Sequence, residues 1–464
     1  GSETATSFNA EVTPQTGVSQ SVHTTALRAT AEKGSKAVPY NLSNSTGAAD
    51  VENTANCYVV NAPGTYSFPL VYGNAINNGQ VNYAAYTSKA SIQGTLNPFI
   101  NHLGNGITDP YIAKNTDCVP VKAELVWQDA PSLVTDIKYN SGTNGGTISF
   151  KVDKENIRQG NALIAIKDSQ NTILWSWHIW ITDENIYHTI KVTNHQNVSH
   201  DLMPIHLGWC EGEVINYAAR SCQVQFIAHG QTRLITVNQM RSTTSTQGNC
   251  TFYEWGRKDP LRPSSGYAYK NKTWYNAAGI ASTANHAVES FPFGNECIKN
   301  YIRKPDVMQK EIGGDNTYFN LWNADNNTNS NVYNDNPVTK TVYDPCPVGF
   351  AMPPSNTFTG FTTTGENVTN TVAKYNGEWN SSLPGWNFYC GPNKTGGTIF
   401  FPMTGERISS GGHLSAVGSL GHTWSATSTH SNYAHNLTLY TNYWVWPLDR
   451  FSKSAGHGVR PCLE

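Results

Sequence analysis

Three aromatic residues near the C-terminal end have the type and spacing to bind a ring-shaped or apolar ligand. Tyr443, Trp444 and Trp446 lie in the run YWVWP at residues 443–447. Alternate side chains of a β-strand point to opposite faces, so Trp444 and Trp446 would share one face and Tyr443 would lie on the other. An exposed aromatic face can stack on a sugar or pack against a protein. Core packing explains the same pattern, and both interpretations stay open at this point.

The sequence offers no comparable signal for catalysis, a cofactor or a metal. It contains no nucleophile elbow, zinc-protease helix motif, phosphate-binding loop or dinucleotide-binding fingerprint. His188, His195, His200 and His206 are close in sequence, but their spacing fits no single helical face, which predicts surface or junction histidines rather than a metal site. We therefore expect a protein that is not an enzyme, without cofactor or metal ligands.

Charge and composition narrow the classes of partner. The 464-residue chain has 31 Lys and Arg against 33 Asp and Glu, which makes nucleic acid a poor partner. No apolar run approaches the roughly 18 residues that span a bilayer. Nine cysteines occur without a CxxC pair, which leaves one or two disulfides open. Gly1 to Glu3 look like the trimmed start of a longer precursor whose export signal has been removed.

The elements that must carry these residues are mostly strands. Residues 1–55 are rich in Ser, Thr, Ala and Asn without periodicity, which predicts an extended or partly disordered segment, with an early edge strand as the alternative. Two hairpins are expected next, one from 135–139 and 147–152 and one from 162–168 and 172–181. With strands at 57–60 and 123–127 they predict a β-sandwich over 56–198. In 172–181 the mixed face, with Ser176 and His178, is expected to lie under a neighbouring domain.

Longer polar loops and short aromatic motifs characterise residues 199–464. We expect Trp255, Trp322 and Trp424 to be core residues, Arg257 and Asp259 to pair locally, and Arg460 to anchor the last strand. The Asn- and Asp-rich tract at 323–336 is expected to be an exposed, solvated loop.

Several of these motifs, in this order, resemble the Fibrobacter-type major paralogous domain of exported bacterial proteins. They are YEWGRKDP at 253–260, NLWN at 320–323, YDPCPVGFAMP at 343–353, and TWSAT at 423–427 followed by GHGVRPC at 456–462. Residues 203–209 depart from the family's usual start, which leaves that boundary uncertain. The family is similar to C-type-lectin-like folds and to formylglycine-generating enzymes, so the resemblance implies an α+β domain with long loops over 199–464. Those enzymes use a cysteine pair, and Cys390 and Cys462 sit in no matching motif.

The N-terminal part resembles the β-domain of Bacteroides-type surface lipoproteins and fimbrillin-like proteins, on the residues at 56–66, 73–75 and 127–130. This implies an exported protein, attached to the outer membrane through a lipidated cysteine that would precede the chain.

Taken together, the sequence predicts a mainly β protein with an α+β part: a sandwich followed by a C-type-lectin-like domain. The expected function is adhesion or recognition at the cell surface in association with fimbriae, with a protein or glycan ligand and pilus subunits as partners. The alternative is a glycan-binding lipoprotein for nutrient capture. Calcium-dependent sugar binding is disfavoured because the EPN, QPD and WND triplets that hold calcium and sugar together are missing.

Overall fold

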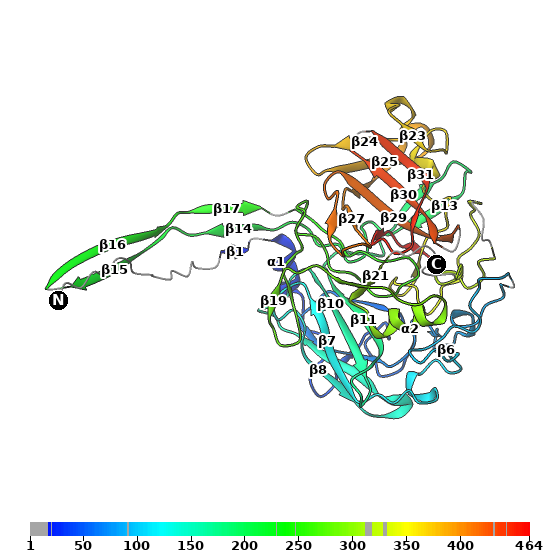
Figure 1. Ribbon diagram of the computed structural model, residues 1–464, viewed down its shortest axis with the longest axis horizontal. Coiled ribbons are helices and arrows are strands. Elements are labelled where there is room, and N and C mark those ends of the chain that lie inside the picture. The colour runs from blue at the N-terminus through cyan, green and yellow to red at the C-terminus, as the bar shows by residue number, and fades with distance from the viewer. Residues whose placement is uncertain are drawn as a thin grey trace.

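The computed structural model has a mainly β fold, as the strand patterns predicted (Figure 1). It describes residues 17–19, 21–90, 92–228, 230–245, 247–310, 318–327, 332–429, 432–441 and 443–464. Within them the α-helices are α1 (Val22–Ala29) and α2 (Asn295–Arg303). A search of the same residues finds no helix with the length and apolar character that crossing a bilayer requires.

Two facing sheets form the part of the molecule drawn at the bottom of Figure 1. The six-stranded sheet runs in the order β19 (Ala281–Ser282), β18 (Trp274–Tyr275), β7 (Lys122–Gln128), β10 (Gly160–Lys167), β11 (Ile173–Ile181) and β3 (Cys57–Val60). The four-stranded sheet runs in the order β2 (Tyr40–Asn41), β4 (Gly64–Pro69), β9 (Thr147–Val152) and β8 (Thr135–Asn140). Both predicted hairpins are confirmed, since β10 pairs with β11 and β8 with β9 in antiparallel register.

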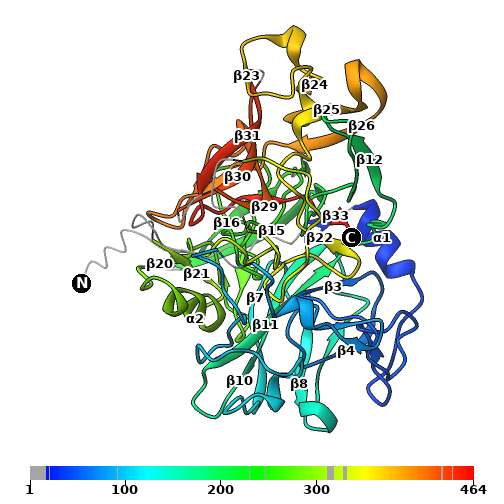
Figure 2. The same ribbon diagram turned by 90° about the vertical axis from the view of Figure 1, so that its right-hand side faces the viewer.

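The opposite part of the molecule, at the top of Figure 1 and Figure 2, is built on another group of sheets. One has five strands, in the order β23 (Val368–Thr369), β31 (Trp444–Ser452), β30 (Tyr433–Tyr440), β29 (Leu420–Ser428) and β32 (Gly458–Val459). A second has β24 (Gly377–Asn380), β25 (Gly385–Gly391) and β26 (Thr395–Pro402), and a third has β12 (Ile190–Thr193), β13 (Ser199–Leu202), β33 (Cys462–Leu463) and β22 (Phe350–Ala351). Three short pairs form sheets of their own: β5 (Ile76–Asn77) with β6 (Gln80–Val81), β20 (Ala287–Glu289) with β21 (Val307–Gln309), and β27 (Glu406–Arg407) with β28 (Leu414–Ser415).

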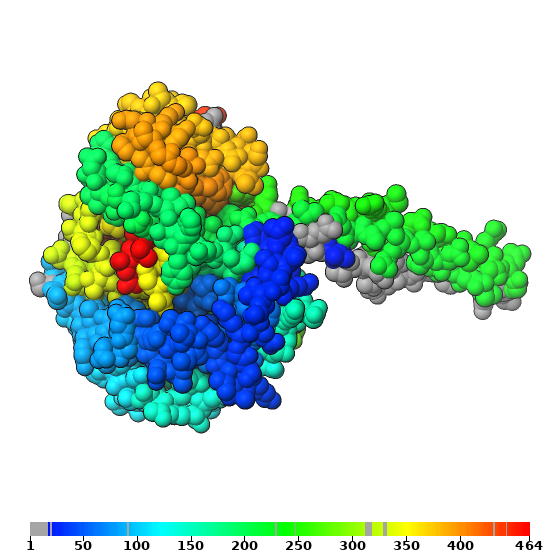
Figure 3. Space-filling model, turned by 180° about the vertical axis from the view of Figure 1, so that it is seen from behind, coloured from blue at the N-terminus to red at the C-terminus, as the bar shows by residue number. Residues whose placement is uncertain are grey.

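A two-stranded arm projects far from these sheets, which the sequence did not lead us to expect (Figure 1 and Figure 3). Its tip is the hairpin of β15 (Arg220–Ala228) and β16 (Gln231–Gln239). Its base is the sheet of β1 (Val18–Ser19), β14 (Val214–Tyr217) and β17 (Ser242–Ser245).

The N-terminal segment differs from the extended form expected for 1–55. Helix α1 begins after Ser21, whose hydroxyl accepts a hydrogen bond from the Thr24 amide, and the buried Leu27 packs it into the core. The signal that the sequence analysis missed is Ser21, a residue type that favours helix starts. A helix this short is stabilised mainly by packing of its buried side chain, Leu27, against the core. Residues 1–16 and 20 of the predicted segment lie outside the described residues.

The ranges 56–198 and 199–464 share a sheet and a hydrophobic core. Tyr275 of β18 pairs with Gln128 of β7, which extends the six-stranded sheet with residues from the second range. The mixed face of β11 is buried as expected: Ser176 donates to Asp259 at 2.7 Å, and the indole of Trp180 donates to the Trp209 carbonyl at 3.0 Å. The neighbour predicted above this face is thus the chain's own C-terminal half.

The aromatic motifs of the second half interlock. Trp255, Trp322 and Trp424 are fully buried, which confirms them as core residues. The indole of Trp255 donates to the Ser425 carbonyl at 3.0 Å, and that of Trp424 donates to the Tyr253 carbonyl at 2.8 Å. Each of these two motifs therefore holds the other in place.

The charged residues of the YEWGRKDP motif are buried but paired differently from the prediction. Arg257 pairs with Glu254 and Asp259 pairs with Lys258, so the expected contact between Arg257 and Asp259 is wrong. Arg460 does anchor its segment, donating to the Met203 and Phe400 carbonyls. The nine cysteines all lie in the described part of the chain and are free thiols, so neither of the disulfides left open is formed.

A buried histidine between the two halves predicts acid sensitivity. His178 is bound by Asn161 at 2.9 Å and Tyr253 at 3.2 Å, and burial lowers its pKa to about 3. Below the unfolded pKa of about 6.5 the unfolded chain takes up a proton that the folded chain refuses, so stability falls as the pH falls. Between pH 7 and pH 5 this histidine should cost about 2 kcal/mol. Urea unfolding at both pH values should show a loss smaller by that amount in H178Q, and equal losses in the two proteins would contradict the prediction.

Candidate functional site

The predicted aromatic residues lie on the five-stranded sheet, at the hairpin of β30 and β31. Trp444 and Trp446 share one face of β31, and both are half-buried. Val445 points to the other face and is fully buried in a hydrophobic cluster. The alternation predicted from the sequence thus holds for these three residues, with the tryptophans on the accessible side.

The rings form a stacked ladder. Trp444 and Trp446 stack with centroids 4.6 Å apart at 9°, and the ring of Tyr440 packs on Trp444 at 4.9 Å. Tyr443 is 53% exposed, and its ring lies 6.0 Å from that of Tyr440. We call Tyr440, Tyr443, Trp444 and Trp446 the aromatic ladder.

Tyr443 differs from its predicted position. Strand β31 begins at Trp444, so Tyr443 belongs to the turn and its ring joins the group on the tryptophan side rather than the opposite face. Tyr440 was missed altogether, because the sequence analysis did not identify β30 as the partner strand. The register that pairs Tyr440 with Trp444 would have revealed it.

Backbone and side-chain bonds hold the ladder in place. The indole of Trp446 donates to the Thr369 hydroxyl at 3.0 Å, and the Asn370 amide donates to the Tyr443 carbonyl at 2.7 Å. Strand β23 also pairs with β31, bringing Thr369 opposite Trp444. The exposed side chains of Thr369 and Asn370 add a polar flank to the aromatic surface. A site built on paired strands in this way is held more precisely than one carried by a free loop.

The stacking determines what the ladder can bind. Because the two indoles lie against each other, their facing surfaces are covered and the ladder offers ring edges and outer faces. Trp and Tyr present a large apolar area with few rotatable bonds, so ordering them on binding costs little entropy. The ladder is therefore suited to anchoring contacts with an apolar or ring-bearing partner.

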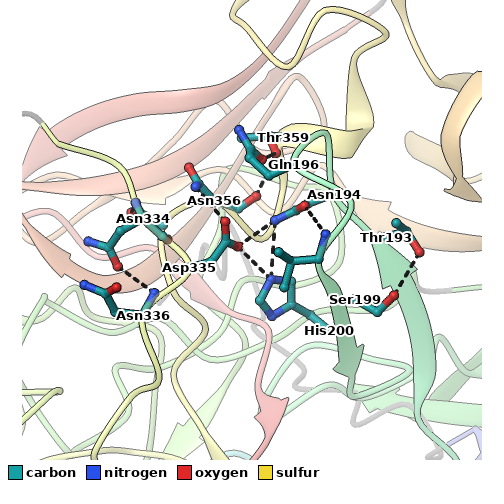
Figure 4. Close-up of polar contacts among 12 residues, drawn as sticks. Thr193, Asn194, Gln196, Ser199, His200, Asn334, Asp335, Asn336, Asn356 and Thr359 are labelled. Carbon is teal, nitrogen blue, oxygen red and sulfur yellow. Dashed lines mark hydrogen bonds and ion pairs between the residues drawn. The ribbon is translucent and has the colours of Figure 1, made fainter.

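The junction histidines do not converge on one site. His200 faces Asp335 at 3.1 Å and lies 3.5 Å from the Asn194 amide (Figure 4). His206 is buried between Thr423 and Arg460, and burial together with the Arg460 charge keeps its pKa well below the ordinary value.

The Asn- and Asp-rich tract is not simply a solvated loop, which corrects the prediction. Asn323 and Asn326 are buried, and the Asn323 side chain accepts from the Thr339 amide at 2.9 Å. At the far end of the tract, Asp335 accepts from Asn194 at 2.6 Å and from Asn356 at 2.8 Å, which ties it to the β12–β13 turn (Figure 4). Residues 328–331 of the tract lie outside the described residues.

A second group was missed entirely: Glu406, His422 and His457. Among the described residues these three bring their carboxylate and imidazole atoms within 4.8 Å of one another. They come from distant parts of the chain, so no local spacing could have pointed to them.

Comparisons with known proteins give no relative from which a function could be transferred. No family model matches the chain, and no curated protein or solved structure is significantly similar to it. The resemblances to the major paralogous domain and to fimbrillin-like proteins accordingly stay predictions.

Proposed function

We propose that this chain is a non-enzymatic recognition protein that binds a protein partner at the surface of the exporting cell, through the aromatic ladder. The observation that carries the proposal is the stack of Trp444 and Trp446, half-exposed on a sheet whose other face is fully packed. Trp and Tyr are the side chains most enriched among residues that dominate protein–protein binding energy.

The shape of the ladder favours a protein over a flat ligand. Ring edges and outer faces fit a groove that surrounds them, whereas a sugar stacked on both indoles at once would need their covered faces. A partner that encloses the ladder would remove water from all four rings, which is the usual environment of strong binding anchors.

The projecting arm supports a role in adhesion or assembly. Ile227, Leu234, Ile235 and Met240 are each at least half-exposed on or beside the β15–β16 hairpin, at 70%, 59%, 52% and 76%. Apolar side chains exposed along a two-stranded ribbon favour contact with another protein, such as a pilus subunit. The arm and the ladder would thus provide separate contacts for attachment and for recognition.

Glycan binding for nutrient capture is the second candidate. It is favoured by the polar flank, since the exposed side chains of Thr369 and Asn370 could hydrogen-bond to the hydroxyls of a sugar that packs on an outer face of the ladder. In this reading the chain is a surface lipoprotein, with membrane contact only through its lipid anchor.

A binding screen of the full chain separates the two candidates. The chain would be tested against immobilised fibronectin, collagen and mucin and against a glycan array, with calcium and with EDTA. We expect binding to protein in both solutions. Binding to the glycan array alone, unchanged by EDTA, would favour nutrient capture. The absence of binding to every probe would contradict both candidates.

A further inference from the structure

Glu406, His422 and His457 converge because of two strand pairings. Arg407 and Gly456 exchange both backbone hydrogen bonds at 2.9 Å, which sets Glu406 beside His457. Strand β32 runs parallel to β29 with Gly458 opposite Thr423, which sets His457 beside His422. The three side chains therefore meet on a rigid part of the fold, not on a loop.

The histidine nitrogens that face this cluster are buried without a hydrogen-bond partner. His457 is fully buried, and neither of its ring nitrogens has a partner. His422 is 2% exposed, and its Nε2 is likewise unpartnered. The nearest carboxylate is that of Glu406, with Oε2 3.7 Å from His457 Nε2. Buried polar atoms are nearly always satisfied, so the orphaned Nε2 atoms of His422 and His457 indicate a missing ligand beside Glu406.

The ring of His422 is held through its Nδ1 atom. Its Nδ1 lies 3.0 Å from the Thr438 hydroxyl and 3.2 Å from the Asn436 amide. Thr438 in turn donates to Asp449 at 2.6 Å and accepts from the Asn436 side chain at 2.9 Å, which fixes the groups that hold Nδ1. These contacts leave Nε2 as the ring nitrogen without a partner. A ligand histidine fixed from behind through its other nitrogen is the usual arrangement of a metal site.

Both rings are held in the neutral form that binds metals. Burial lowers the pKa of His422 to about 3, with a further contribution from His457, and burial alone holds the pKa of His457 well below its ordinary value. The ring of His457 stacks between those of His422 and Trp424, at 4.3 Å and 4.2 Å. The stacking holds both imidazoles in place beside Glu406.

We infer that Glu406, His422 and His457 form a binding site for a divalent transition metal, with Zn²⁺ as the best match. Two imidazoles and one carboxylate are a preferred donor set for zinc, and water would complete four-coordination. Bonds of about 2.0–2.1 Å in a tetrahedron place donor atoms roughly 3.3 Å apart. The ligand atoms lie within 4.8 Å of one another and the two imidazoles stack at 11°, so the side chains must close in and one ring must turn for both nitrogens to meet at the ion. Glu406 has the partly exposed side chain and thus the most room to move.

Metal stoichiometry tests the site without reference to the proposed partner binding. The full chain, carrying Cys222→Ser to remove an exposed thiol, would be stripped with EDTA, titrated with Zn²⁺ and measured by inductively coupled plasma mass spectrometry. We expect about one tightly bound Zn²⁺ per chain. Glu406→Gln, His422→Gln and His457→Gln should each weaken binding by at least about tenfold, the loss caused even by removing an outer-shell partner.

His413→Asn is the matched control, because this exposed histidine lies in the same β27–β28 hairpin as Glu406. It should bind like the parent protein. Co²⁺ loaded into the parent should give the strong visible absorption of a tetrahedral site, a readout that does not depend on whether a histidine variant folds. A parent protein that binds no Zn²⁺, or one whose binding is unchanged by Glu406→Gln and both histidine changes, would overturn the inference.

Discussion

Replacing Arg257 with Met is expected to destabilise the folded chain by about 3–5 kcal/mol, because it leaves the carboxylate of Glu254 buried without its cation. Both side chains are fully buried. The guanidinium also donates to the Val307 carbonyl at 2.7 Å and to the Lys304 carbonyl at 2.9 Å. The free energy of unfolding in urea at pH 7 measures the loss.

Two further variants distinguish a buried pair from a general effect of charge removal. In the double variant E254L/R257M no charge is left unpaired, so it should be clearly more stable than R257M alone. E289Q removes one member of the exposed Lys304–Glu289 pair and should change stability by less than about 1 kcal/mol. A double variant as unstable as R257M would show that the hydrogen bonds of Arg257, not the orphaned carboxylate, determine the loss.

The strands of the N-terminal half were predictable because their signals are local. The runs at 162–168 and 172–181 alternate or are continuously apolar and are separated by polar turn residues, and they become β10 and β11 with nearly the predicted bounds. Burial of the mixed face of β11 was predicted too, because Leu174 and Trp180 on that face bring large apolar side chains.

Features set by distant contacts could not be predicted. The sequence does not show that β18 extends the six-stranded sheet through Tyr275, or that Arg257 selects Glu254 rather than Asp259. Both depend on which segments meet after folding. The arm was missed for a related reason. Its strands have the mixed apolar and polar pattern of an ordinary hairpin, and this pattern does not show whether another sheet will cover the apolar side chains.

Only part of the candidate site could be predicted from the sequence. Alternation along one strand correctly paired Trp444 with Trp446, but it misplaced Tyr443, because a strand's first residue cannot be located to within one position. Tyr440 depended on cross-strand register. The cluster of Glu406, His422 and His457 depends on two pairings between distant segments, which a single sequence does not reveal.

Truncation of the aromatic ladder is expected to weaken partner binding strongly while leaving the fold intact. Trp444→Ala and Trp446→Ala should each weaken binding by about tenfold or more, equivalent to about 1.4 kcal/mol per ring, and the double variant by more than either. The reason is that these half-exposed rings contribute contact area at little entropic cost, while the buried Val445 holds the strand to its sheet. Affinity would be measured by surface plasmon resonance for whichever immobilised probe the parent protein binds.

Trp379→Ala is the matched control for this experiment, because Trp379 is also half-buried but lies on β24, outside the ladder. Its ring packs against the buried Trp386 at 5.8 Å, so its loss tests the general effect of removing a tryptophan. Near-UV circular dichroism and thermal unfolding would verify that all variants keep the parent fold. Equal losses of affinity in Trp379→Ala and Trp446→Ala would place the binding surface elsewhere. A selective loss in the ladder variants, with Tyr443→Ala intermediate, would locate the contact at the β30–β31 hairpin, since Tyr443 lies at the edge of the stack and not within it.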